Sequence, residues 1–117
     1  MTPMMQFMCH CSICRKASGV QGMAVVIVPK NRFEWLKGKE YITEWTKPGH
    51  DWQTRFCKNC GSALPGDNDE KQYYVPAGLI VEGVESLQVS HHIFLDSKAP
   101  WFQVCDAGKR HLHGFNE

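Results

Sequence analysis

Two tight cysteine clusters constrain this 117-residue chain more than any other feature. Five of its six cysteines fall in the patterns Cys9-x-Cys11-x-x-Cys14 and Cys57-x-x-Cys60. Residues two apart in an extended segment face the same side, so the side chains of Cys9 and Cys11 should converge. A C-x-x-C turn lets two more sulfurs meet one ion. The clusters therefore predict metal binding rather than a disulfide framework.

Two arrangements of the metal ligands fit this spacing. In the pooled arrangement, Cys11, Cys14, Cys57 and Cys60 close one structural site. The 42 residues between the two C-x-x-C motifs exceed the roughly 15–20 of a zinc ribbon, and Cys9 is left over. In the split arrangement, the first three cysteines hold a metal with an open fourth position, and the other pair belongs to a second site. An open position is typical of catalytic zinc, and spacing alone leaves both arrangements open.

Composition predicts one globular domain spanning residues 1–117. Hydrophobic residues make up 43% of the chain and charged residues 21%, which excludes wholesale disorder. The longest apolar run is Met23–Val28, far short of the roughly 20 residues that a membrane span needs. The first residues carry no secretory signal, so we expect the reducing cytoplasm. A net charge of +1 weighs against nucleic acid as a partner.

The hydrophobic pattern predicts an all-β fold. A short helix is expected over Ser12–Ala17, ended by Gly19. Short strands separated by turn residues predict a sandwich or a partly open barrel, with Trp45 and Trp52 packing within it. The expected strands are Met23–Val28, Arg32–Leu36, Tyr41–Trp45, Trp52–Phe56, Gln72–Pro76 and Leu87–Leu95.

A resemblance to a known family rests on four segments: CHCSICRKASG at 9–19, RFCKNCGSAL at 55–64, GLI at 78–80 and HIFLDSKAPWF at 92–102. In these segments the chain resembles the glutathione-dependent formaldehyde-activating enzyme family, which also includes centromere protein V-like domains. The resemblance implies an Mss4-like zinc-binding sandwich of short antiparallel strands.

The resemblance favours the split arrangement of ligands. It implies that Cys9, Cys11 and Cys14 are the catalytic zinc ligands and that Cys57 and Cys60 are half of a structural zinc site. The family carries the other half, C-x-C-G, on an upstream first strand. This sequence has no such motif, so we expect that strand to be missing and the second zinc site to be incomplete.

The family activity implied is that of a carbon–sulfur lyase, which joins glutathione and formaldehyde in S-hydroxymethylglutathione or forms a related thiol adduct. The ligand chemistry agrees with this expectation. Three thiolates leave zinc with a net charge near −1, which suits it poorly to generating hydroxide. Soft zinc–sulfur chemistry suits a thiol as the fourth ligand, and binding lowers the pKa of that thiol. The alternative function is a non-enzymatic zinc-binding interaction module.

Five further residues are candidates for substrate binding. Arg15 and Lys16 follow the first cluster and could bind a substrate carboxylate, or they could be solvated charges of a turn. His92 could act as an acid or base, and the competing interpretation is a hydrogen-bonded strand histidine. Lys98 and Trp101 lie in the SKAPWF segment, where Trp101 could wall the pocket or cap the core.

The remaining expectations concern structure. His10 lies between two ligands and should point away from the metal. Cys105 is expected to be a buried free thiol. A missing first strand would leave an unpaired sheet edge, which invites a homodimer formed by strand pairing. In place of that strand, a flexible arm is expected around the methionines at the start of the chain, Met1, Met4, Met5 and Met8.

Overall fold

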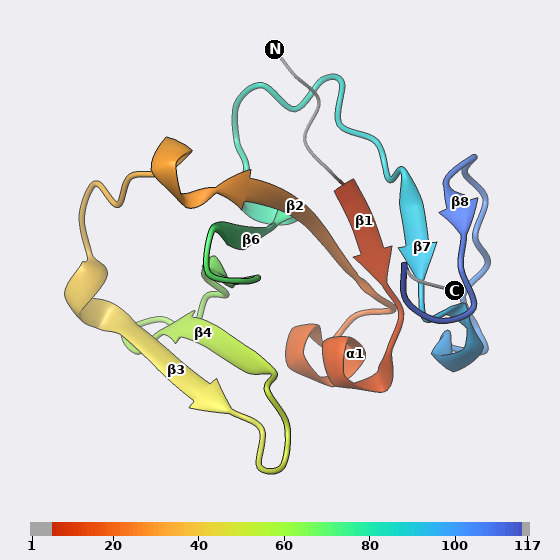
Figure 1. The fold of residues 1–117 in the computed structure, drawn as a ribbon, viewed down its shortest axis with the longest axis horizontal. Coiled ribbons are helices and arrows are strands. Elements are labelled where there is room, and N and C mark those ends of the chain that lie inside the picture. Colours follow the sequence, from red (N-terminus) through yellow and green to blue (C-terminus); the bar gives the residue numbers. More distant parts are fainter. Residues whose placement is uncertain (1–5, 116–117) are drawn as a thin grey trace.

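A six-stranded sheet in the order β5-β6-β2-β1-β7-β8 forms the body of the molecule, and a separate two-stranded sheet pairs β3 with β4 (Figure 1). The structure is a computed structural model that describes residues 6–115. The predicted all-β class is confirmed. The strands of the large sheet are β1 (Gln6–Cys9), β2 (Met23–Pro29), β5 (Gly66–Asp67), β6 (Gln72–Pro76), β7 (His91–Ile93) and β8 (Lys109–Arg110).

The first strand, β1, lies in the interior of the large sheet. It pairs antiparallel with β2 and parallel with β7, and Met8 is opposite Ala24 on one side and His92 on the other. The expectation of a flexible arm is therefore wrong for Met8, whereas Met1, Met4 and Met5 lie outside the described residues. The sheet is mixed, because β7 and β8 also run parallel. The edge strands of this sheet are β5 and β8. A homodimer formed by strand pairing at a sheet edge stays a prediction.

The helix α1 (Ser12–Ser18) follows β1 after a two-residue connection. The side chain of Cys11 caps its start by accepting a hydrogen bond from the Cys14 backbone N–H. Gly19 ends it in the left-handed conformation, at φ 72°, and donates to the Arg15 carbonyl. The predicted helix is thus confirmed. No helix within residues 6–115 is long and apolar enough to cross a membrane.

The central strand β2 supplies three of the eight buried apolar residues in the described structure, more than any other element. Val25, Val26 and Ile27 are buried in the middle of the run that the sequence predicts as a buried strand. Val75 of β6 joins them across an antiparallel pairing. A second buried cluster is formed by Cys9, Cys14 and Ile93, with partly buried apolar side chains packed against it, namely Phe7, Met23 and Phe94. The first cysteine cluster is therefore built into the core.

The small sheet is a hairpin of β3 (Ile42–Thr46) and β4 (Gln53–Cys57). Its strands agree with the predicted strands within one or two residues. Trp45 of β3 is opposite Thr54 of β4, and Cys57 is opposite Ile42. The hairpin lies beside the large sheet and faces α1 (Figure 1). Its position places the second C-x-x-C motif at the end of β4.

Two predicted strands are wrong in whole or in part. The segment Arg32–Leu36 pairs with no strand within residues 6–115. Its aromatic residues pack as an edge-to-face cluster instead, with the ring of Phe33 4.9 Å from that of Tyr73. The predicted strand Leu87–Leu95 is reduced to β7, which ends before Phe94, where the backbone takes the left-handed conformation at φ 57°. Cys105 is exposed rather than buried.

We expect the buried face of β2 to set the stability of the fold. Ile27→Ala should lower the free energy of unfolding by about 2–5 kcal/mol, because it leaves a cavity in the core. Leu36→Ala is the matched control, since Leu36 is 86% exposed, and it should change the free energy by about 0.5 kcal/mol or less. Urea unfolding followed by tryptophan fluorescence measures both. Equal effects of the two substitutions would contradict the assigned core.

Candidate metal centre

Three cysteine sulfurs converge where β1 meets α1. The sulfurs of Cys9, Cys11 and Cys14 all lie within 4.8 Å of one another, and those of Cys9 and Cys11 are 3.4 Å apart. Zinc–sulfur bonds of about 2.3 Å in a tetrahedral site would place sulfurs about 3.8 Å apart. The trio can therefore hold a metal ion with little rearrangement. It is the one group of three or more such ligands within residues 6–115.

Local structure explains this convergence. Cys9 is the last residue of β1, where pairing with Met23 of β2 and Ile93 of β7 fixes its direction. Cys11 caps α1, and its sulfur accepts a hydrogen bond from the Cys14 backbone N–H over 3.3 Å. Cys14 lies in the first turn of the helix and is buried. One strand end and one helix start thus aim three sulfurs at one point.

The metal-free trio stabilises a single negative charge. Contacts with the Cys14 and Cys9 side chains lower the pKa of Cys11 far below its usual value, because both neighbours hydrogen-bond to its thiolate. The same contacts raise the pKa of Cys14, and the contact with Cys11 raises the pKa of Cys9 to about 11. Near neutral pH, one thiolate therefore receives hydrogen bonds from two thiols. A divalent cation would replace the protons of those two thiols.

The trio lies on the wall of a cavity of about 440 Å³. Phe7, Met23 and Phe94 supply an apolar part of its lining. Tyr74 also lines it, and burial raises the pKa of its hydroxyl, which donates to the Gln53 carbonyl over 3.2 Å. Space therefore exists beside the sulfurs for a small organic molecule. The other polar side chains in the lining are His50, Asp51, Gln53, Asp67 and Asn68.

A second hollow of about 520 Å³ adjoins this cavity, and Ile13 and Trp52 line both. It lies between α1 and the β3–β4 hairpin, and we call it the lysine groove, after Lys16 and Lys47 in its lining. No aspartate or glutamate lines it. Trp45 lines the groove and is 50% exposed, contrary to the expectation that it packs within the fold. An exposed tryptophan beside two lysines suits an anionic ligand with an apolar part.

Arg55 also lines the lysine groove, but its charge is already paired. Its Nε lies 2.6 Å from Glu44 Oε1, and its terminal nitrogen lies 3.5 Å from Asp67 Oδ2. In contrast, no ion pair of Lys16 or Lys47 is found within residues 6–115. The two lysines thus supply the unpaired positive charge of the groove. Sequence reasoning missed Lys47 and Trp52, because only the folded hairpin brings them to α1.

The second cysteine pair lies apart from the trio. Cys57 ends β4, and Cys60 is exposed on the turn that follows, 3.1 Å from the hydroxyl of Ser62. Contacts with Ser62 lower the pKa of Cys60. Within the described residues, this pair has no third cysteine, histidine or carboxylate close enough to complete a metal site. The described structure therefore does not bring together the four cysteines of the pooled arrangement. The separate trio agrees with the first site of the split arrangement, and the metal ligands stay a prediction.

The predicted substrate-binding residues separate into two groups. Lys16 lines the lysine groove, and Arg15 beside it is half-buried, with a buried Nε that has no hydrogen-bond partner within residues 6–115. His92, Lys98 and Trp101 do not line the cavity beside the sulfurs. His92 is buried, the Lys98 ammonium donates to two backbone carbonyls, and Trp101 is 73% exposed. Roles for these three residues stay predictions.

His10 points away from the sulfurs, as its place between two ligands predicts. Its Nε2 lies 2.9 Å from Nδ1 of His92, and both rings are buried. Sequence reasoning gave His10 no partner. The pair forms because β1 and β7 are parallel neighbours in the sheet.

Comparison with known families agrees with this geometry. The family model of the glutathione-dependent formaldehyde-activating enzyme matches residues 1–97. The match includes both cysteine clusters, α1 and β7, and it ends before Lys98. The trio, the cavity and the groove are thus built mainly from the matched part of the chain.

We expect the trio to hold the metal and the second pair to contribute nothing to it. Cys11→Ser should abolish the binding of one equivalent of metal by the reduced protein, because two sulfurs hold an ion far more weakly than three. Cys60→Ser should leave that equivalent in place. Elemental analysis after gel filtration measures both. Loss of metal in both variants would contradict the split arrangement, and Cys105→Ser controls for the loss of an exposed thiol.

Proposed function

The chain belongs to the glutathione-dependent formaldehyde-activating enzyme family, and from that premise we propose that it is a zinc-dependent carbon–sulfur lyase acting on glutathione and formaldehyde. The observation that carries the proposal is the placement of three convergent sulfurs on the wall of an open cavity. A non-enzymatic zinc module would need a closed structural site. The cavity beside the trio therefore supports the enzymatic interpretation.

The donor set fits zinc. Three sulfurs within 4.8 Å of one another suit a soft, tetrahedral ion and leave its fourth position open. When bound, zinc would supply a soft Lewis acid that favours the thiolate form of an incoming thiol. The residues proposed to hold it are Cys9, Cys11 and Cys14. The proposal includes no zinc at Cys57 and Cys60, since that pair lacks further ligands within residues 6–115.

In the proposed reaction, the glutathione sulfur forms a bond to the formaldehyde carbon. The carbon–oxygen π bond breaks, and the thiol proton is transferred to the oxygen, so the product is S-hydroxymethylglutathione. The reverse reaction breaks the same carbon–sulfur bond. Tyr74 lines the cavity with a protonated hydroxyl, which now donates to the Gln53 carbonyl and would have to leave it to donate to the aldehyde oxygen.

The lysine groove is suited to the remainder of the thiol substrate. Glutathione carries two carboxylates. Lys16 and Lys47 present unpaired ammonium groups in the groove that adjoins the cavity beside the sulfurs. Ile13 and Trp52 form the junction, so a molecule that spans it places its thiol on the sulfur side and its charges on the lysine side. Charge complementarity would orient the substrate at this junction. We also propose a reducing, cytoplasmic location, which keeps both substrate and cysteines as thiols.

Removing positive charge from the lysine groove should weaken the binding of glutathione more than that of a thiol without carboxylates. We expect Lys16→Ala to raise KM for glutathione about fivefold, the effect of losing one partly exposed charge contact, with little change in kcat. Nuclear magnetic resonance exchange rates between glutathione and its formaldehyde adduct, corrected for the uncatalysed reaction, measure this. Lys37→Ala is the matched control, because Lys37 is exposed and lies outside the groove. An equal loss with 2-mercaptoethanol, which has no carboxylate, would contradict the assignment.

Metal affinity should depend steeply on pH. The pKa of Cys11 is lowered and those of Cys9 and Cys14 are raised, so the metal-free trio carries two protons near pH 7. Binding releases both protons, and affinity should therefore fall about 100-fold for each pH unit of acidification. Chelator competition between pH 6 and 8, corrected for protonation of the chelator, measures the slope. An affinity independent of pH would show that these protons are not displaced.

A further inference from the structure

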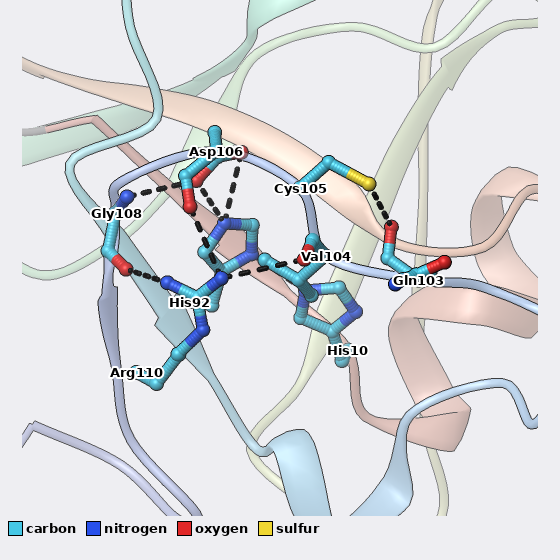
Figure 2. Close-up of polar contacts among 8 residues, drawn as sticks. All are labelled: His10, His92, Gln103, Val104, Cys105, Asp106, Gly108 and Arg110. Carbon is cyan, nitrogen blue, oxygen red and sulfur yellow. Dashed lines mark hydrogen bonds and ion pairs between the residues drawn. The ribbon is translucent and has the colours of Figure 1, made fainter.

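The side chains of Asp106, His92 and His10 form a hydrogen-bonded chain (Figure 2). His10 lies between Cys9 and Cys11 of the trio in the sequence. His92 Nε2 lies 2.9 and 3.1 Å from the two carboxylate oxygens of Asp106, and His92 Nδ1 lies 2.9 Å from His10 Nε2. His10 is 0% exposed and His92 is 1% exposed. Two buried imidazoles cost more desolvation free energy than apolar side chains in the same space. Their presence beside the metal centre therefore needs a functional explanation.

The carboxylate of Asp106 fixes the direction of every bond in this chain. A carboxylate only accepts hydrogen bonds, so in the neutral form of its ring His92 carries the proton on Nε2. His92 Nδ1 is then an acceptor, and His10 must donate to it from Nε2. Donation from His92 and from the Gly108 N–H holds the pKa of Asp106 below its usual value and keeps it ionised. One exposed carboxylate thus sets the tautomers of two buried rings.

The loop that carries Asp106 is fixed against His92. The guanidinium of Arg110 donates to the main-chain carbonyls of Val104, Asp106 and Gly108 over 2.8–3.3 Å (Figure 2). Gly108 has no room for a side chain, because a Cβ there would lie 2.7 Å from the Val89 carbonyl and 3.0 Å from the His92 ring. This loop lies beyond residues 1–97, where the family match ends.

At the other end, His10 joins two of the candidate ligands. Its backbone N–H donates to the Ile93 carbonyl over 3.0 Å, and its side chain donates to His92, so both bonds anchor it to β7. His10 Nδ1 is buried and has no partner within residues 6–115. The bond to His92 is therefore the one hydrogen bond that orients the ring in the described structure. His10 is joined by peptide bonds to both Cys9 and Cys11, so its two bonds to β7 act between these candidate ligands.

We propose that His92 and Asp106 are positioning residues for the metal centre: through His10 they hold Cys9 and Cys11 at the separation that a metal ion needs. The proposal rests on the assignment of the cysteine trio as a metal site. Outer hydrogen-bond partners of metal ligands typically change metal affinity 10- to 100-fold. His10 is not itself a ligand, so in this protein the hydrogen bonds of His92 and Asp106 would change metal affinity through the backbone that joins Cys9 to Cys11.

The test uses the full chain and Co²⁺ as a spectroscopic probe. Asp106→Ala removes the acceptor of the His92 proton, whereas Asp106→Asn retains an amide oxygen that can accept it. Asp96→Ala is the matched control, since Asp96 also pairs with a histidine, its Oδ2 lying 3.6 Å from Nε2 of His113. Three readouts are needed: Co²⁺ affinity, the thiolate-to-cobalt and d–d absorption bands, and histidine tautomers from long-range ¹H–¹⁵N spectra of the metal-free protein.

We expect Asp106→Ala to weaken Co²⁺ binding about tenfold, to shift the d–d bands, and to mix the tautomers of His10 and His92. Asp106→Asn should recover most of the affinity, and Asp96→Ala should match the wild type. Wild-type affinity, bands and tautomers in Asp106→Ala would overturn the proposal. The proposal would also be overturned if Asp106→Ala and Asp106→Asn weakened Co²⁺ binding equally and in proportion to their loss of thermal stability.

Failure of the proposed function gives a different result. If the wild-type trio bound no metal, all variants would lack the cobalt bands, and the assignment of the metal centre would be wrong. Amide hydrogen exchange at His10 and Cys11 in the metal-free protein still tests the positioning role in that case. We expect faster exchange in Asp106→Ala than in Asp96→Ala, and equal rates would overturn the role of Asp106.

Discussion

The alternation of side chains at the end of β1 is the constraint on which the rest of the site depends. Cys9 faces the cavity together with Phe7, two residues earlier, whereas His10 turns to the opposite side and meets His92. β1 is hydrogen-bonded on both sides, to β2 and β7, so its register is fixed. A slip of one residue would exchange the two faces and separate the sulfurs.

Chemistry and substrate space come from different parts of the chain. The sulfurs are local, because a strand end and a helix start place them within six residues. The space beside them is not local, since the β3–β4 hairpin brings Trp52 and Lys47 to α1, and β6 brings Tyr74 to the cavity. A compact ligand motif can therefore recur in many proteins, whereas the surrounding walls decide which molecule reaches it.

The two C-x-x-C motifs show how surroundings change the chemistry of the same spacing. Cys11 and Cys14 lie in a core that also contains Cys9, and three sulfurs share one negative charge. Cys57 ends β4 and Cys60 lies on the turn that follows, where Cys60 is exposed and forms a hydrogen bond with Ser62. A third sulfur within reach distinguishes a metal site from a pair of thiols, and spacing within the pair contains no information about it.

Local sequence determines several features of this protein. The cap of α1 by Cys11 and its end at Gly19, the buried run of β2, the hairpin strands and the convergence of three cysteines all follow from spacing and backbone preference. Short-range geometry determines each of them. Tertiary structure decided the parallel pairing of β1 with β7, the loss of Arg32–Leu36 as a strand and the left-handed Phe94. It also decided the contacts of His92 with His10 and with Asp106. These depend on partners up to 82 residues apart, such as His10 and His92, and local pattern does not encode which distant segment supplies the partner.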